Sequence, residues 1–282
     1  MLLPRLPLAI DTRRVVSFDG TSIAYHVTPA PYAGAPWVIL ANGLGGTYLS
    51  WWQQVAHFAK SHTCVIFAHR GFTPSGAVAG ETAPDAYVDD LAALIKELDL
   101  GKVSLVAQSM GGWTCLGYAL REPANVRTLV MASTAGPINC AKLENFSQTF
   151  EDWLAYSKKS FEDLQARDLS VAIGERMERE QPAFARLYRQ INNLTPADFR
   201  AAVRKSLRQS WVQDPALLVR LPMPVLFITG DEDCVFPSAA GAPLAKLAPK
   251  GRAATVSRAG HSVYFERAAE FNRIVGEFLS SH

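Results

Sequence analysis

Short runs of β-branched and other apolar residues recur along the chain and alternate with longer stretches that have helical spacing. The runs span residues 37–41, 63–68, 103–107, 127–132 and 225–229. They are apolar almost throughout, whereas a strand with one solvated face alternates apolar and polar residues. Strands covered on both faces are typical of parallel sheets. The sequence therefore predicts an α/β fold with a mostly parallel central sheet and helices on both faces.

Helical spacing of apolar residues marks the segments between these strands. We expect helices over residues 51–60, 84–98, 110–122, 238–247 and 266–280. Before the first buried run, residues 15–18 and 21–27 flank Asp19-Gly20, a dipeptide that favours tight turns. The chain is therefore expected to begin with a hairpin at one edge of the sheet.

The pattern of the sequence changes between residues 136 and 214. This part has long amphipathic helical patterns and no run typical of a strand, and the next strand is expected to start at Pro224. A chain of 282 residues corresponds to about two domains of average size, and one core with an inserted subdomain satisfies that expectation. We expect 136–214 to form a helical cap over the carboxyl ends of the strands, with 1–135 and 215–282 forming the core.

Composition and charge narrow the class of partner. Hydrophobic residues make up 49% of the chain and charged residues 19%, which allows a sizeable core and excludes intrinsic disorder. The 28 basic and 26 acidic residues give a net charge of +2 and form no long run of one sign. Binding to nucleic acid or to a membrane surface is therefore not expected. A small, neutral molecule is the expected partner, bound by a monomer or homodimer.

Neither a cofactor, nor a metal ion, nor a membrane segment is indicated. The four cysteines lack metal-ligand spacing and predict neither a zinc site nor a disulfide framework: Cys64, Cys115, Cys140 and Cys234. No apolar stretch approaches the roughly 20 residues needed to cross a bilayer. Residues 1–8 are apolar but are interrupted by Pro4 and Pro7, which argues against a signal peptide. We therefore expect a cytoplasmic, cofactor-independent protein.

The most informative motif joins the end of one predicted strand to the start of the next helix. It places Ser109 between Ala107 and Gly111, in the pattern small-x-Ser-x-Gly. A sharp turn brings the strand and helix backbones together, so small residues are needed on both sides, and the serine is strained so that its hydroxyl is exposed. The N–H of Met110, at the helix N-terminus, is then expected to donate to an oxyanion on a reacting carbonyl.

A glycine-rich loop, Asn42-Gly43-Leu44-Gly45-Gly46, follows the predicted strand 37–41. Its glycines allow the backbone to approach a substrate closely. In an acyl-transfer site, the N–H of Leu44 is expected to point at the same oxyanion as the N–H of Met110.

A serine hydroxyl needs an imidazole to take its proton and a carboxylate to orient that imidazole. A polar turn at 230–237 contains Asp231, Glu232 and Asp233, and the segment 259–262 contains His261. The order serine, acid, histidine accompanies this type of strand-to-helix turn. All three acidic residues are candidates for the carboxylate.

These motifs resemble those of capped α/β-hydrolase-fold enzymes of the ester and lactone hydrolase kind, and the resemblance covers nearly the whole chain. It implies that Ser109 is the nucleophile, that His261 is the general base and then the acid, and that the amides of Leu44 and Met110 form the oxyanion hole. It also favours Asp233 as the acid, because similar proteins have the acid three residues after a glycine and a proline four residues further on.

The chain departs from the usual family pattern at several positions. Ala107 replaces the first glycine of the turn, a variant that the family tolerates. Asn42 replaces a histidine that usually precedes the oxyanion glycine, so the hydrogen bonds that support this loop are expected to differ. In the segment 68–75, Ala68 and Thr73 replace an aspartate and a glycine.

Aromatic side chains are candidates for an apolar substrate pocket, and we expect contact from Trp153, Phe146 and Tyr264. The resulting hypothesis is a serine hydrolase without cofactor. It would cleave a carboxylic ester or lactone of a small to medium, mainly apolar substrate through an acyl-enzyme.

Two alternatives use the same residues. C–C bond hydrolases of ring-cleavage products share the fold and triad, but they are expected to have Asn before the nucleophile and Trp after the histidine. This chain has Gln108 and Ser262 at those positions. A ligand receptor on the hydrolase scaffold would turn over slowly and stall after about one equivalent of product.

Overall fold

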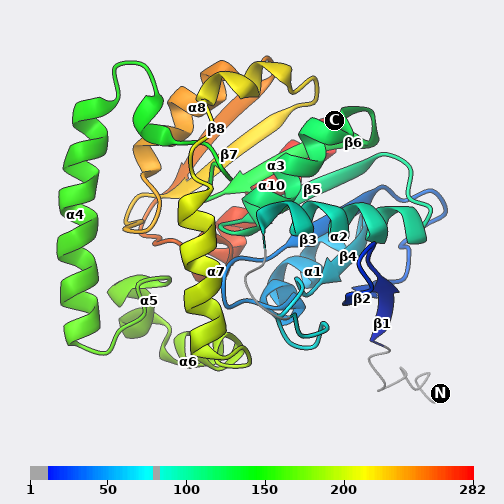
Figure 1. Ribbon diagram of the computed structural model, residues 1–282, viewed down its shortest axis with the longest axis horizontal. Coiled ribbons are helices and arrows are strands. Elements are labelled where there is room, and N and C mark those ends of the chain that lie inside the picture. Colours follow the sequence, from blue (N-terminus) through cyan, green and yellow to red (C-terminus); the bar gives the residue numbers. More distant parts are fainter. Residues whose placement is uncertain (1–11, 79–82) are drawn as a thin grey trace.

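The computed structural model describes residues 12–78 and 83–282, so the N-terminal segment 1–8 lies outside the described residues. The strands span Arg13–Val16 (β1), Ser22–Val27 (β2), Trp37–Ala41 (β3), Thr63–Phe67 (β4), Val103–Gln108 (β5), Val126–Ala132 (β6), Val225–Gly230 (β7) and Gly251–Val256 (β8). They form one eight-stranded sheet with the order β1-β2-β4-β3-β5-β6-β7-β8 (Figure 1). The β1–β2 hairpin is antiparallel and β2 pairs antiparallel with β4, whereas the strands from β3 to β8 are parallel. The predicted sheet class and edge hairpin are confirmed.

Helices cover both faces of the sheet (Figure 1). The helices of the core span Trp52–Phe58 (α1), Pro84–Glu97 (α2), Gly111–Arg121 (α3), Gly241–Leu247 (α8), Val263–Glu266 (α9) and Ala268–Ser280 (α10). On one face, Leu105 of β5 shares a buried cluster with residues of α2, α3 and α8. On the other face, the next residue, Val106, shares a second cluster with residues of α1 and α10. Both faces are therefore apolar, which explains the unbroken apolar runs in the sequence.

Further helices lie between β6 and β7. They span Ser147–Ala166 (α4), Gly174–Glu180 (α5), Pro182–Asn192 (α6) and Ala197–Gln209 (α7). Figure 1 shows them gathered to one side of the sheet, with α4 outermost. Val203 and Leu207 of α7 pack in a cluster with Met110, so α7 lies next to the carboxyl end of β5. The assignment of 136–214 to a separate cap domain stays a prediction.

Short 3-10 helices complete the fold: Tyr48–Trp51 (η1), Pro123–Asn125 (η2), Cys140–Lys142 (η3), Pro215–Arg220 (η4) and Ser238–Ala240 (η5). The predicted helix 238–247 therefore starts as a 3-10 turn. Instead of the single predicted helix 266–280, α9 ends at Glu266 and α10 starts at Ala268. Arg267 between them has φ −128° and ψ 51°, which is outside the α-helical region. Across the described ranges, no helix combines the length and apolarity that a bilayer crossing requires.

A buried ion pair joins the edge hairpin to the rest of the core. Arg70 follows β4, and its Nε donates to Asp90 Oδ2 of α2 over 2.8 Å. Its guanidinium also pairs with Asp19 in the β1–β2 turn. Arg70 and Asp90 are both buried, whereas Asp19 is exposed. The segment 68–75, which departs from the family pattern, is thus held in place by the charge of Arg70.

Replacing Asp90 with Asn should lower the free energy of unfolding by about 3 kcal/mol, because it leaves the buried Arg70 charge with only an exposed partner. Denaturant unfolding measures the effect. Asp89→Asn is the matched control, since Asp89 pairs with Arg121 at the surface and its loss should cost under about 1 kcal/mol. Equal losses in the two variants would contradict the prediction.

Candidate active site

Ser109 lies at a strained turn between β5 and α3. Its φ is +50°, a left-handed value that is uncommon for residues other than glycine. A Cβ added at Gly111 would lie 2.3 Å from the Ala41 carbonyl oxygen, and one at Gly112 would lie 2.4 Å from Thr134 Oγ1. The strain at the serine and the need for a small residue at Gly111 are therefore confirmed.

The structure brings the hydroxyl, imidazole and carboxylate together from three separate loops. His261 Nε2 lies 2.9 Å from Ser109 Oγ, and His261 Nδ1 lies 3.0 Å from Asp233 Oδ2. Asp233 and His261 are buried. An imidazole that bridges a hydroxyl and a carboxylate has the geometry for proton transfer from the serine.

Of the three candidate acids, Asp233 is the one that faces His261. Its Oδ1 also accepts hydrogen bonds from the N–H groups of Val235 and Phe236, at 2.8 and 2.9 Å. Asp231 instead accepts from the N–H of Arg258 at 2.7 Å. Glu232, which lies between these two residues, accepts from Arg176 Nε, and each of its carboxylate oxygens lies 2.9 Å from that nitrogen. The neighbouring carboxylates therefore hold the surrounding backbone and helix α5.

The glycine-rich loop 42–46 lies directly against the serine turn. A Cβ added at Gly43 would lie 2.0 Å from Gln108 Oε1 and 2.9 Å from Ser109 Cβ. Asn42, which replaces the usual histidine, donates from Nδ2 to the carbonyls of Gly43 and Gly46 at 3.1 and 2.8 Å. The side chain of Asn42 therefore supports the loop from within.

The N–H groups of Leu44 and Met110 have no hydrogen-bond acceptor among residues 12–78 and 83–282. Buried backbone N–H groups are nearly always paired. Two unpaired N–H groups, one in the loop beside Ser109 and one immediately after it, are available to a negatively charged oxygen.

Helix α4 holds the loop that bears the carboxylate. Trp153 Nε1 donates to the Asp233 carbonyl at 3.3 Å, Tyr156 Oη to the Glu232 carbonyl at 3.2 Å, and Ser157 Oγ to the Cys234 carbonyl at 2.6 Å. Three consecutive carbonyls are thus bound from one helix. Sequence reasoning missed this role, because it considered Trp153 only as a substrate contact and did not weigh the other two residues.

The other predicted pocket residues lie in buried clusters. Phe146 packs in the core cluster that also covers one face of the sheet. Tyr264 packs against Trp51, with ring centroids 4.3 Å apart. Trp113 of α3, which was not among the predicted contacts, is partly buried, and its Nε1 donates to the Oγ of Ser210, just after the end of α7, at 2.8 Å. Substrate contact by Phe146, Tyr264 and Trp153 stays a prediction.

His69 is buried, and its imidazole bonds to α3 instead of to Ser109 or His261. Its Nε2 lies 2.9 Å from Thr114 Oγ1, and burial lowers the pKa of its imidazole to about 3. It therefore stays neutral near pH 7 and packs among aromatic rings.

Glu266 is a site residue that the sequence analysis missed. Its carboxylate accepts from the N–H of Gly260 at 2.8 Å and from the N–H of Ser262 at 3.1 Å, on both sides of His261. Burial, together with the negative charge of Asp233, raises the pKa of Glu266 to about 8. The one signal in the sequence is an acidic residue at the end of the apolar run 263–265.

Comparisons with known proteins agree with this architecture. A family model described as alpha/beta hydrolase fold matches residues 36–268. The 2-hydroxymuconate semialdehyde hydrolase of Pseudomonas sp. (strain CF600) is 27% identical over 256 residues, which cover 88% of this chain and 88% of that protein.

Two solved structures show the same fold. The enol-lactonase from Burkholderia xenovorans LB400 has a TM-score of 0.78 at 22% identity, covering 95% of this chain and 100% of that one. A thermophilic esterase from Thermogutta terrifontis has a TM-score of 0.77 at 21% identity, covering 96% and 98%.

Replacing Glu266 with Gln should flatten the pH dependence of stability. The pKa of this carboxyl is raised from 4.5 to about 8 on folding, so the folded state holds a proton that the unfolded state releases. Its contribution to stability is therefore lost as the pH rises toward and through about 8. The melting temperature of the wild type should fall between pH 6 and 9, and that of the variant should fall less. Glu270→Gln, on the surface of α10, is the control; equal slopes in the wild type and Glu266→Gln would refute the assignment.

Proposed function

Because the chain belongs to the alpha/beta hydrolase fold family, we propose that it is a serine hydrolase that cleaves a carboxylic ester or lactone through an acyl-enzyme. The observation that carries the proposal is the continuous contact from Ser109 Oγ through His261 to Asp233. The esterase and enol-lactonase names of structural neighbours support the same bond class. We expect a small to medium acyl or lactone substrate, with no cofactor.

In this mechanism, Ser109 attacks the substrate carbonyl while His261 Nε2 takes the hydroxyl proton. Asp233 holds the Nδ1 proton and stabilises the imidazolium that forms. The unpaired N–H groups of Leu44 and Met110 bind the oxyanion, and each such donor is worth about 3 kcal/mol of transition-state stabilisation. His261 then protonates the leaving alcohol. Water, activated by the same imidazole, releases the acid and restores Ser109.

The helices of 136–214 act in this proposal as a cap on the core formed by 1–135 and 215–282. Helix α7 packs its apolar residues beside Leu44 and Met110, where the acyl group would lie. Trp153 is partly exposed, whereas Phe146 and Tyr264 are buried, so Trp153 is the aromatic residue best placed to contact substrate. The cap would exclude water from the reacting groups.

A second candidate function is hydrolysis of a C–C bond in a ring-cleavage product. It is favoured by the 27% identity to a 2-hydroxymuconate semialdehyde hydrolase. Against it, Gln108 Nε2 donates to the His261 carbonyl at 3.3 Å, and the Ser262 hydroxyl lies 2.8 Å from Tyr188 Oη. These positions therefore hold the histidine loop with residues that C–C hydrolases are not expected to have. Parallel assays with 2-hydroxymuconate semialdehyde and with esters separate the two candidates.

Ser109→Ala should reduce hydrolysis of 4-nitrophenyl butyrate by at least about 10⁴-fold, because it removes the nucleophile. The melting temperature should stay close to that of the wild type. Release of 4-nitrophenol is followed past one equivalent, since steady turnover distinguishes an enzyme from a receptor that stalls. Unchanged hydrolysis in the variant would reject the mechanism.

Asp233→Asn should lower kcat by about 10⁴-fold, because the imidazole would lose its orienting carboxylate. Asp231→Asn is the matched control: it is two residues away and binds backbone N–H groups, so its kcat should change by less than about tenfold. A larger loss of kcat in Asp231→Asn than in Asp233→Asn would assign the acid to Asp231.

A further inference from the structure

Helix α6 contacts the segment that carries His261. The Tyr188 hydroxyl oxygen lies 2.8 Å from the Oγ of Ser262, the residue after His261, and both side chains are buried. The ring of Tyr188 packs edge-on against Phe265, with ring centroids 5.1 Å apart. The Ser262 N–H donates to the Ala172 carbonyl at 2.9 Å. The backbone and the side chain of the residue next to the imidazole are therefore both bound by the chain segment between β6 and β7.

One turn later, the same helix reaches the glycine-rich loop. A Cβ added at Gly45 would lie 2.1 Å from Asn192 Oδ1, so this side chain lies directly against the residue after Leu44. Gly45 has a φ of +88°. Glycine is needed at this position both for its backbone conformation and because a side chain would collide with Asn192. Asn192 therefore limits the positions that the Leu44 N–H can take.

The Asn192 side chain is itself held in place. Its Nδ2 donates to the Tyr188 carbonyl at 2.9 Å, and its backbone carbonyl accepts from Arg200 Nη1 at 2.8 Å. Burial raises the pKa of the Tyr188 phenol to about 12, while its hydrogen bond to Ser262 lowers that pKa. The phenol is therefore neutral near pH 7 and bonds to Ser262 as a hydroxyl. The contacts to the histidine segment and to the glycine-rich loop are thus joined within one turn of α6.

Helix α6 is packed on the core. Its buried residues, Ala185, Tyr188 and Ile191, belong to the cluster on one face of the sheet. In its first turn, Phe184 contacts Trp52 of α1, with ring centroids 5.8 Å apart. Because close-packed side chains transmit small displacements, the helix is a fixed reference for both loops. Proton transfer and oxyanion binding both depend on groups held within roughly 0.5 Å of the productive geometry.

We propose that α6 positions two parts of the candidate site at once, the imidazole through Tyr188 and the oxyanion loop through Asn192. Tyr188 acts through the Ser262 hydroxyl, and Asn192 acts through its contact with Gly45, so both are positioning residues. This inference rests on the proposed hydrolysis at Ser109. In this proposal, the predicted cap is required for the chemical step itself.

Tyr188→Phe removes the hydroxyl and keeps the packed ring. It should lower kcat for 4-nitrophenyl butyrate by about five- to tenfold and leave KM within about twofold, because the imidazole would spend less time in the geometry for proton transfer. Ser262→Ala removes the other half of the same hydrogen bond and should have a similar effect. The double variant should lose no more activity than the more impaired single variant, since both changes break one bond.

Proton NMR separates positioning from a general loss of stability. In the wild type, the Nδ1 proton of His261 lies between the imidazole and Asp233 and should give a downfield resonance. Faster exchange with solvent should weaken this resonance in both variants of the hydroxyl pair. Tyr32→Phe is the control, because it removes a hydroxyl that donates to a backbone carbonyl at the surface. Its resonance and its kcat should match those of the wild type.

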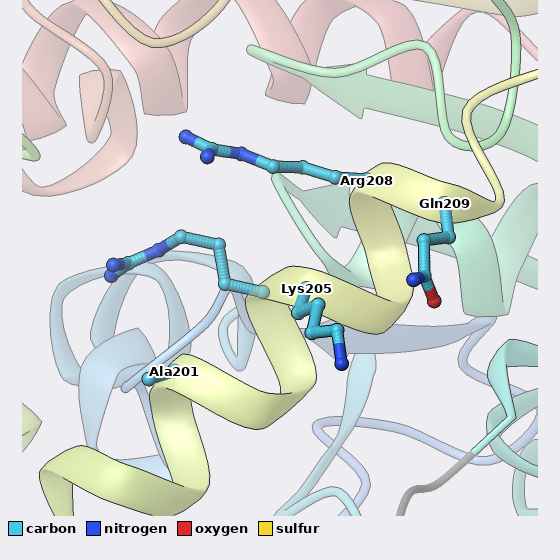
Figure 2. A pocket seen from close by; sticks show the side chains of 5 residues that line it. Ala201, Lys205, Arg208 and Gln209 are labelled. Carbon is cyan, nitrogen blue, oxygen red and sulfur yellow. The ribbon is translucent and has the colours of Figure 1, made fainter.

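Asn192→Ala opens a gap beside Gly45 and should loosen the oxyanion loop. We expect kcat/KM to fall by about tenfold. The affinity for a trifluoromethyl ketone, which forms a tetrahedral adduct with the serine hydroxyl, should fall by the same factor. Gln209→Ala is the matched control, because it removes an amide side chain from the exposed surface of α7, where Gln209 lines a hollow (Figure 2). Both quantities should stay within about twofold of the wild type in this control.

Unchanged kcat and an unchanged resonance in Tyr188→Phe, or unchanged inhibitor affinity in Asn192→Ala, would overturn the proposal and leave the proposed function standing. If Tyr188→Phe does not fold, Ser262→Ala tests the same contact. A wild type that hydrolyses no ester but shows the His261 resonance, lost in Tyr188→Phe and kept in Tyr32→Phe, would have the opposite meaning. The positioning role would then stand and the proposed function would fail.

Discussion

The contact between the end of β3 and the start of α3 is the constraint on which the site depends. Gly111 lies so close to the Ala41 carbonyl that even a methyl group would collide with it. This proximity forces the turn at Ser109 into a left-handed conformation and leaves its hydroxyl facing His261. It also brings the glycine loop after β3 alongside the serine. Backbone packing therefore sets the position of the Ser109 hydroxyl and of the unpaired N–H groups of Leu44 and Met110.

The remaining polar groups are held by residues outside the three central ones. Side chains of α4 bind the carbonyls around Asp233, and Glu266 binds the N–H groups on both sides of His261. Arg176 of α5 adds an ion pair to the acid turn through Glu232. The helices between β6 and β7 are thus part of the support of the candidate site, and rigid support is what a hydrogen-bonded triad requires.

Much of the candidate site followed from local sequence. The pattern around Ser109 required a tight turn. The acidic turn and the His261 segment come later in the chain, in the order that accompanies such a turn. The choice among the acids did not follow from spacing alone. Asp231 and Asp233 lie in the same turn and differ only in the direction in which their side chains point. Asp231 faces backbone N–H groups, whereas Asp233 faces the imidazole. Residue type and spacing do not report such directions.

The sequence by itself determined the class of sheet, its edge hairpin, the strand boundaries within a few residues and the strained turn at Ser109. These features depend on local periodicity and on the space that small residues leave. Only the tertiary structure decided that Trp153 binds the acid loop and that Glu266 supports the histidine loop. Both depend on which side chains from distant segments meet, and local periodicity and spacing carry no information about such meetings.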